Sequence, residues 1–112
     1  ELYTDSGRTP TGVDPVTWVK RVVSLGAGEI LLTFIHQDGT YAGYDLTLLK
    51  QITQSVSIPV IASGGGGTID HLISAYQAGA DALAIASLLH FNKTDIKTIK
   101  RKLKLKKIPI RI

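Results

Sequence analysis

The sequence predicts an α/β fold in which about three parallel strands alternate with helices, as part of a (β/α)8 or TIM barrel. Three observations lead to this fold. Apolar strand-like runs alternate with helical patterns along the chain. A short motif recurs, because Leu25-Gly-Ala-Gly-Glu-Ile30 and Ala78-Gly-Ala-Asp-Ala-Leu83 each end a helix and enter a strand. A glycine run at residues 64–67 follows a buried strand.

The first third of the chain predicts a short strand, a helix and one main strand. Residues 2–4 are typical of a short strand or hairpin arm, and residues 5–12 form a polar loop. Asp14-Pro15 places an N-cap before a proline at the first helical position, which predicts a helix that runs to Ser24 and stops at Gly26. Residues 29–35 form a strand whose continuous apolar run predicts that both of its faces are covered.

The rest of the chain continues the same alternation. The expected elements are a helix capped by Asp45, a strand at 59–63, a helix at 69–78, a strand at 82–86, a turn or short helix at 87–91 and a helix at 94–103. A basic and apolar tail, residues 106–112, follows them. A complete (β/α)8 barrel takes about 250 residues. Residues 1–112 are therefore expected to be one unit that supplies less than half of a barrel.

The composition and residue spacing argue against disulfides, metal sites and membrane spans. The chain has no cysteine, which excludes disulfides and thiolate metal sites and fits a cytoplasmic location. His36, His71 and His90 share no metal-ligand spacing, so neither a metal nor a cofactor is expected. No apolar run approaches the roughly 18–20 residues that span a membrane. The chain also lacks methionine, so Glu1 is not a natural start and we expect a fragment of something longer.

The basic character of the chain belongs to its end. The formal net charge is +4, but nine of the 13 Lys and Arg residues and only one of the nine acids lie from Lys93 onward. Such a tail can bind nucleic acid. It lacks interleaved aromatic residues, however, and Ile96, Ile99 and Leu103 predict a buried stripe on the same helix. A solvated helix face is the favoured interpretation, with no nucleic-acid partner.

The glycine run is the strongest functional signal. A strand that ends in Ser63 and Gly64-Gly65-Gly66-Gly67, followed at once by a helix, has the geometry that holds a phosphate. Glycines let the backbone approach the ligand, and their N–H groups donate to its oxygens. The alternative is a flexible turn with no ligand. Ser87 ends the next strand, where its hydroxyl is available for a phosphate or for capping the short helix after it.

A second loop of this kind is Asp38-Gly39-Thr40, which follows the first main strand. Aspartate serves as a general acid or base, and Gly-Thr binds phosphate through an N–H and a hydroxyl. On residue types alone an ordinary Asp-Gly turn is the favoured interpretation. The position favours function, since functional groups of α/β barrels gather at the carboxyl ends of strands. Thr33, inside the preceding strand, either faces the barrel mouth or is a plain strand threonine.

Each histidine can also be interpreted as a residue with no role in catalysis or metal binding. His71, near a helix start, is expected at the surface, and His90, between Leu89 and Phe91, is expected to be packed. His36 lies close to Asp38 in sequence, so a catalytic role is open to it beside a structural one.

Several of these motifs together resemble one family. The segments 26–33, 38–40, 43–45, 58–65, 78–81 and 90–91, which carry Gly-Ala-Gly-Glu, Asp-Gly-Thr, Gly-Tyr-Asp, Ile-Pro-Val-Ile-Ala-Ser-Gly-Gly, Ala-Gly-Ala-Asp and His-Phe, are similar to the cyclase subunit of imidazole glycerol phosphate synthase. The match runs nearly end to end. It covers only the C-terminal half of that barrel, beginning after the fifth strand.

The resemblance implies a lyase of histidine biosynthesis. Its substrate is a bisphosphorylated ribulosyl-formimino-aminoimidazole carboxamide nucleotide, and ammonia reaches it through the barrel from a glutaminase partner. The products are imidazole glycerol phosphate and aminoimidazole carboxamide ribotide. By the same resemblance, Gly64, Gly65 and Ser87 bind the substrate phosphate of this half, Asp38, Gly39 and Thr40 line the site, and Thr33 faces the substrate. With the loop arguments above, the expected phosphate-binding residues are Gly39, Thr40, Ser63, Gly64, Gly65, Gly66 and Ser87, and the expected catalytic residues are Asp38 and Thr33. The resemblance also places Glu29 in the charged ring through which ammonia enters.

Departures from the family pattern leave alternatives open. The family's two principal catalytic aspartates lie on its first and fifth strands, outside the match, so the isolated chain is expected to be inactive. His36 stands where the family commonly has Asp, and Phe34 where it has Ser. A cyclase-like, ammonia-using subunit of a surface-sugar amidotransferase is therefore an alternative. A non-catalytic phosphate-binding half-barrel is another, with open sheet edges covered by self-association.

Overall fold

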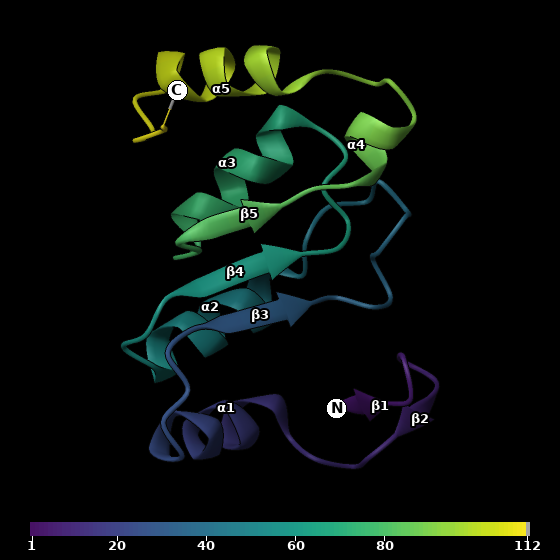
Figure 1. Cartoon of the computed structure of the whole chain (residues 1–112), viewed down its shortest axis with the longest axis vertical. Coiled ribbons are helices and arrows are strands. Elements are labelled where there is room, and N and C mark those ends of the chain that lie inside the picture. Colours follow the sequence, from purple (N-terminus) through teal and green to yellow (C-terminus); the bar gives the residue numbers. More distant parts are fainter. Residues whose placement is uncertain (112) are drawn as a thin grey trace.

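The structure, a computed structural model, describes residues 1–111 and has the expected α/β fold (Figure 1). The elements are β1 (Tyr3–Thr4), β2 (Thr9–Pro10), α1 (Pro15–Ser24), β3 (Ile30–Thr33), α2 (Leu46–Ser55), β4 (Val60–Ser63), α3 (Ile69–Gln77), β5 (Ala82–Ala84), α4 (Ser87–His90) and α5 (Ile96–Leu105). Each expected helix and main strand is present within two residues of its expected bounds. Ile112, the last residue of the expected tail, lies outside the described residues.

The centre of the molecule is a parallel sheet in the order β3-β4-β5. The register places Leu31 beside Ile61 and Thr33 beside Ser63, with Ser63 in turn beside Ala84. Strands that neighbour each other in the sheet are also consecutive main strands of the chain, joined through α2 and α3. Three parallel strands with connecting helices are consistent with part of a (β/α)8 barrel.

Helix starts follow from side-chain caps. The carboxylate of Asp14 accepts a hydrogen bond from the Thr17 N–H at 2.9 Å. Equivalent bonds join Asp45 to the Leu48 N–H, Thr68 to the His71 N–H and Asp95 to the Thr98 N–H. Each satisfies an N–H that has no partner inside the helix. These bonds hold the pKa values of Asp14 and Asp95 below their usual range.

The two copies of the repeated sequence motif form the same kind of helix end. After α1, Gly26 adopts φ +101°, and the N–H groups of Gly26 and Ala27 donate to the carbonyls of Val23 and Val22. After α3, Gly79 adopts φ +106° with the same pair of bonds. This is a Schellman motif, which a glycine in the left-handed region forms with least strain. The two copies turn the chain into β3 and β5.

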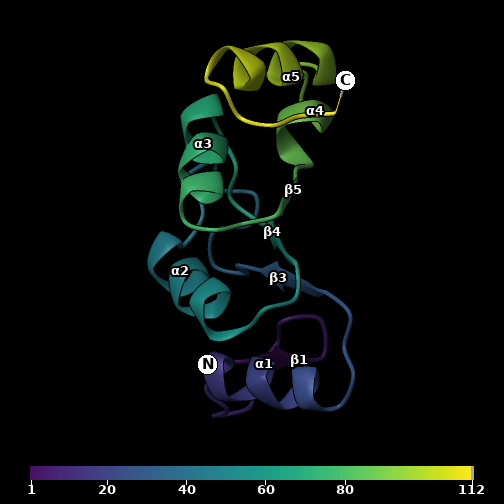
Figure 2. The same cartoon turned by 90° about the vertical axis from the view of Figure 1, so that its left-hand side faces the viewer.

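One face of the sheet is covered, and it carries the core. Figure 2 shows α2 and α3 on the same side of the strands. Leu49 and Ile52 of α2, Leu72 of α3, and Val60 and Ala62 of β4 are at most 1% exposed. Their helical positions repeat at three or four residues and their strand positions at two, as one-sided packing requires.

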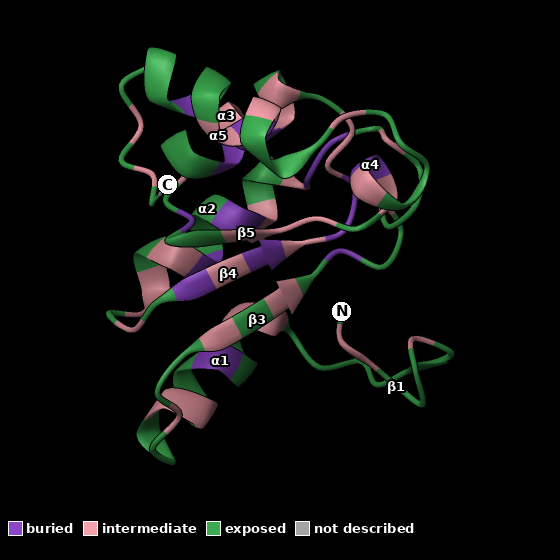
Figure 3. Ribbon diagram, turned by 45° about the horizontal axis from the view of Figure 1, so that its top comes forward, coloured by how far each residue is buried: buried purple, intermediate pink, exposed green. Residues whose placement is uncertain are grey.

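The opposite face of the sheet is open in this chain. Leu31 is 62% exposed, and Thr33 beside it is exposed as well. Figure 3 shows the alternation, with β3 changing between intermediate and exposed residues and β4 between buried and intermediate ones. The expectation that both faces of the 29–35 strand are covered is therefore wrong for the chain by itself. In a closed barrel this second face points inward, where other strands cover it.

The two ends of the chain add smaller features. The loop at 5–12 contains a second short strand, so β1 and β2 form an antiparallel hairpin. In α5, Ile99 and Leu103 are buried as expected, whereas Ile96 is 45% exposed. The helix ends with Lys107 at φ +60°, in the position that glycine takes after α1 and α3.

Candidate functional site

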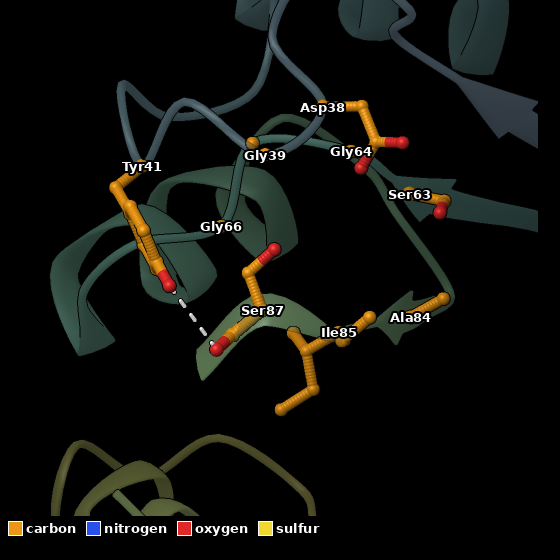
Figure 4. A pocket seen from close by; sticks show the side chains of 11 residues that line it. Asp38, Gly39, Tyr41, Ser63, Gly64, Gly66, Ala84, Ile85 and Ser87 are labelled. Atoms are coloured by element: carbon orange, nitrogen blue, oxygen red, sulfur yellow. Dashed lines mark hydrogen bonds between the residues drawn. The ribbon is translucent and has the colours of Figure 1, made fainter. Parts of the chain in front are cut away.

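A pocket lies where β4 and β5 end. It is shallow and open to solvent, with a cavity volume of about 30 Å³. Its wall contains seven of the residues that the sequence proposes for phosphate or substrate, namely Asp38, Gly39, Ser63, Gly64, Gly65, Gly66 and Ser87. Tyr41, Ala84, Ile85 and Ala86 complete it (Figure 4). The carboxyl ends of parallel strands thus bring three separate loops together, as in other α/β sites.

The glycine run packs against the β3–α2 loop, residues 34–45, backbone to backbone. The Gly43 N–H donates to the Gly65 carbonyl at 2.8 Å. A Cβ on Gly64 would lie 2.9 Å from the Phe34 carbonyl oxygen, and a Cβ on Gly65 would collide with the Gly43 carbonyl. Both glycines also have φ near +100°, which side chains disfavour. Close loop packing, and not flexibility, requires these two glycines.

The next two glycines face tyrosines. A Cβ on Gly66 would lie 2.6 Å from the Tyr44 hydroxyl, and one on Gly67 would collide with the Tyr41 backbone. Tyr44 lies under the pocket, where its hydroxyl donates to the Ala84 carbonyl at 3.5 Å and its ring meets Phe34 edge-on at 6.2 Å. Burial raises the pKa of Tyr44 to about 12, so the phenol stays neutral beneath the site.

The pocket offers backbone donors. Within residues 1–111, the N–H groups of Gly65, Gly66 and Ser87 make no hydrogen bond to another protein group. The Ser87 hydroxyl extends toward Gly66 (Figure 4). Successive N–H groups in a glycine loop form a concave site for anionic oxygens. Asp38 adds a carboxylate on the opposite wall, which suits proton transfer and not anion binding.

Three proposed site residues lie outside the pocket. Thr40 is exposed, and its hydroxyl donates to the Gln37 carbonyl at 2.6 Å and accepts from the Ala42 N–H at 3.1 Å, which ties it into the turn. Thr33 occupies the same register row as Ser63, one strand farther from the pocket, on the open face. Glu29 is exposed and precedes β3, at the other end of the strands.

Other sequence expectations for this region need correction. Ser87 does not cap α4, because Ala86 is the N-cap and no side-chain cap bond forms there. His90 is exposed and not packed, although its ring meets Phe91 edge-on. His71 is half-buried and not at the surface, since its Nδ1 accepts the Gly67 N–H at 3.0 Å. His36 is exposed and lies 5.8 Å from the Tyr3 ring, outside the pocket wall.

Sequence reasoning missed Tyr41. It adopts φ +59°, and its hydroxyl donates to the Ser87 carbonyl at 3.2 Å across the pocket (Figure 4). The Lys93 ammonium lies 5.9 Å from the centre of its ring. A bulky residue in the left-handed region costs about 1–2 kcal/mol and is found where surrounding contacts enforce it. In the sequence, only the place of Tyr41 directly after Asp-Gly-Thr could have indicated that it belongs to the site.

Two other kinds of site were sought in the described chain. Residues 1–111 contain no group of three or more histidine or acidic side chains placed to hold a metal ion. No helix in that range is both long and apolar enough to span a bilayer.

Comparisons with known proteins agree on a family. The family model described as "Histidine biosynthesis protein" matches residues 1–95. Imidazole glycerol phosphate synthase subunit HisF from Methanococcus vannielii is 50% identical over the whole chain, and the subunits from Pyrobaculum aerophilum and Chloroherpeton thalassium are 52% and 50% identical. The chain covers 42%, 44% and 45% of these three relatives. It therefore spans less than half of their length.

Proposed function

The chain belongs to the histidine biosynthesis protein family, and from that premise we propose that it is the C-terminal part of a cyclase barrel. The parent reaction is the one that the resemblance implies. A bisphosphorylated ribulosyl-formimino nucleotide and ammonia give imidazole glycerol phosphate and aminoimidazole carboxamide ribotide. In this proposal, the chain binds one of the two substrate phosphates and supplies part of the reacting site.

The pocket at the ends of β4 and β5 is the observation that carries the proposal. It combines the N–H groups of Gly65, Gly66 and Ser87, which have no protein partner in the described part of the chain, with the Ser63 and Ser87 hydroxyls. Neutral donors of this kind surround a phosphate ester without burying a cation. The relatives named as imidazole glycerol phosphate synthase subunits support a phosphate as the anion.

The register of the sheet supports a direction for the rest of the substrate. Ser63 lies on the pocket wall, and Thr33 follows in the same row on the open face, one strand spacing of about 4.8 Å away. A substrate held by its phosphate would extend over this row toward the barrel centre. Asp38 lies beside Gly64, and its Cβ is 3.4 Å from the position that a Cβ on Gly64 would take. We propose Asp38 as a proton-transfer group and Thr33 as a hydrogen-bonding residue toward the same substrate.

The open face supports a larger assembly. In the parent protein, the remaining strands of the barrel would pair with β3 and β5 and cover Leu31. In the isolated chain, a second copy would take their place. In the parent barrel, Glu29 would lie at the end opposite the pocket, where the proposed glutaminase partner delivers ammonia. Glu29 is exposed and on that end of β3, as this role needs.

A phosphate-binding half-barrel without catalysis is the second candidate, and the pocket favours it equally well. Only turnover separates this candidate from the cyclase.

The remaining alternative, a subunit of a surface-sugar amidotransferase, is addressed by the positions of Phe34 and His36. Phe34 is buried against Tyr44, and His36 is exposed against Tyr3, so neither side chain lies on the pocket wall. This arrangement supports the histidine-pathway substrate over that of a surface-sugar amidotransferase, because the two departures from the family pattern leave the phosphate wall unchanged.

Ammonia-dependent turnover of the ribulosyl-formimino nucleotide tests the proposal. The chain is assayed alone and after mixing with the N-terminal half of the Methanococcus vannielii relative. We expect turnover only in the mixture, and its loss when Asp38→Asn replaces the wild-type chain. The matched control is Asp5→Asn, an exposed acid in the β1–β2 turn outside the pocket, which should leave turnover unchanged. Phosphate binding with no turnover in a stable mixture would contradict the cyclase and leave the half-barrel.

A further inference from the structure

His71 joins the two loops that build the pocket. Its Nδ1 accepts the N–H of Gly67, the residue that follows the pocket wall, at 3.0 Å. Its ring also packs on Gly43, where an added Cβ would lie 3.2 Å from Cδ2 and 3.3 Å from Nε2. Gly43 in turn donates to the Gly65 carbonyl. One imidazole therefore contacts both the glycine run and the β3–α2 loop.

The local geometry is a variant of a capping box. Thr68 is the N-cap of α3, and its hydroxyl accepts the N–H of His71, the third helical residue. In the usual box, a Glu or Gln at that third position reaches back to an N–H at the helix start. Here a histidine makes the return bond, and it reaches Gly67, one residue farther back. Because Nδ1 accepts, that atom carries no proton.

Charge explains why a histidine suits this position. Asp38 already puts one carboxylate on the pocket wall, and Asp70 puts another, exposed, in the first turn of α3. A glutamate at position 71 would make the same return bond but would add a third negative charge directly behind the glycine run. A phosphate dianion would be repelled by it. A neutral acceptor holds the loop without this penalty.

We propose that His71 is a positioning residue of the anion pocket, which fixes the glycine run against the β3–α2 loop through a neutral acceptor. The inference rests on the proposed function of the pocket as a phosphate site. It assigns a role to a side chain that does not touch the ligand. Substitutions at position 71 can therefore separate two properties that usually change together, the stability of the loop and its affinity for an anion.

The experiment compares His71→Gln with His71→Glu in the full chain at one fixed pH, 8. Inorganic phosphate is the ligand and calorimetry gives its affinity, while urea unfolding gives stability. Gln and Glu are matched in length and both complete a capping box. We expect the two variants to unfold at similar urea concentrations, with phosphate affinity near wild type for Gln and on the order of tenfold weaker for Glu.

A third variant, His71→Ala, removes the acceptor and should weaken phosphate binding on the order of tenfold as well. Equal phosphate affinity of the Gln and Glu variants would overturn the role of charge. Wild-type affinity in His71→Ala would overturn the positioning role. If the wild-type chain does not bind phosphate, the proposed phosphate site fails. The urea midpoint of His71→Ala then still tests the contact with the two loops, because a midpoint equal to wild type would overturn it.

Discussion

The two faces of the parallel sheet carry similar apolar side chains but lie in different surroundings. On the helix side, Val60 and Ala62 are 1% and 0% exposed, while on the other side Leu31 is 62% exposed. The strand sequence alone does not distinguish them, since Ile30, Leu31 and Leu32 are all large and apolar. What differs is the neighbour, because α2 and α3 cover one face, whereas Leu31 on the other face stays largely exposed within residues 1–111. We propose that further strands or a second copy of the chain cover this open face.

The largest expected effect comes from truncating a side chain on the covered face. Leu49→Ala should lower the free energy of unfolding by about 3–4 kcal/mol, because Leu49 is fully buried and its loss leaves a cavity. Leu31→Ala on the open face should cost less than about 1 kcal/mol. Urea unfolding at low protein concentration measures both values. Equal losses at the two positions would mean that the open face is covered in solution by something as tightly packed as α2.

The glycines give an intermediate effect and a graded control series. Gly65→Ala should destabilise by about 2–3 kcal/mol and remove phosphate binding, because both a positive φ and a collision with Gly43 oppose the methyl group. Gly26 has a positive φ but free space, so Gly26→Ala should cost about 1 kcal/mol. Gly28 has neither problem, and Gly28→Ala should be neutral within about 0.5 kcal/mol.

Thermal unfolding with and without inorganic phosphate distinguishes these three variants. A Gly65→Ala chain that is as stable as Gly28→Ala and still binds phosphate would show that the glycine run does not pack against the β3–α2 loop.

The smallest expected effect concerns pH and the tyrosine beneath the pocket. Burial raises the pKa of Tyr44 from 10.0 to about 12 in the folded chain. The unfolded chain therefore loses this proton first as the pH rises. The contribution of Tyr44 to stability is complete below pH 10 and is lost as the pH rises from about 10 to about 12. Unfolding midpoints across this window should fall less steeply in Tyr44→Phe than in wild type.

Tyr76→Phe is the matched control, since Tyr76 is 41% exposed. It should follow the wild-type pH curve. If instead the two tyrosine variants behave alike, the Tyr44 phenol is not buried by the loops that form the pocket.

Local patterns predicted much of the fold. The caps at Asp14 and Asp45 and the glycine stop at Gly26 depend on residues within one or two turns, so the sequence alone indicated them. The repeated helix end likewise reappears as two Schellman motifs. The strands were expected slightly too long at 29–35 and 82–86, because apolar residues continue past the last ladder bond.

The rest depends on contacts that are distant in sequence. Exposure of Leu31 depends on what covers the sheet, and a strand pattern does not contain that information. The local sequence predicted His71 at the surface. That prediction failed because the contact of His71 with Gly43 joins residues 28 positions apart, which the local sequence does not indicate. The pocket itself was largely predictable, since Asp38, Ser63, Gly64 and Ser87 all follow strands of one parallel sheet. Tyr41 was not, because its hydrogen bond to the Ser87 carbonyl joins residues that are 46 positions apart.

Sedimentation is the most direct test of the claim that the open face belongs inside a barrel. The chain has a mass of 12.0 kDa and would be run alone and with the N-terminal half of the Methanococcus vannielii relative, alongside Leu31→Asp as the variant with a charged open face. We predict a self-associated species for the chain alone, a one-to-one complex in the mixture, and neither for Leu31→Asp. A wild-type chain that stays a 12.0 kDa monomer at every concentration and ignores the other half would contradict the account.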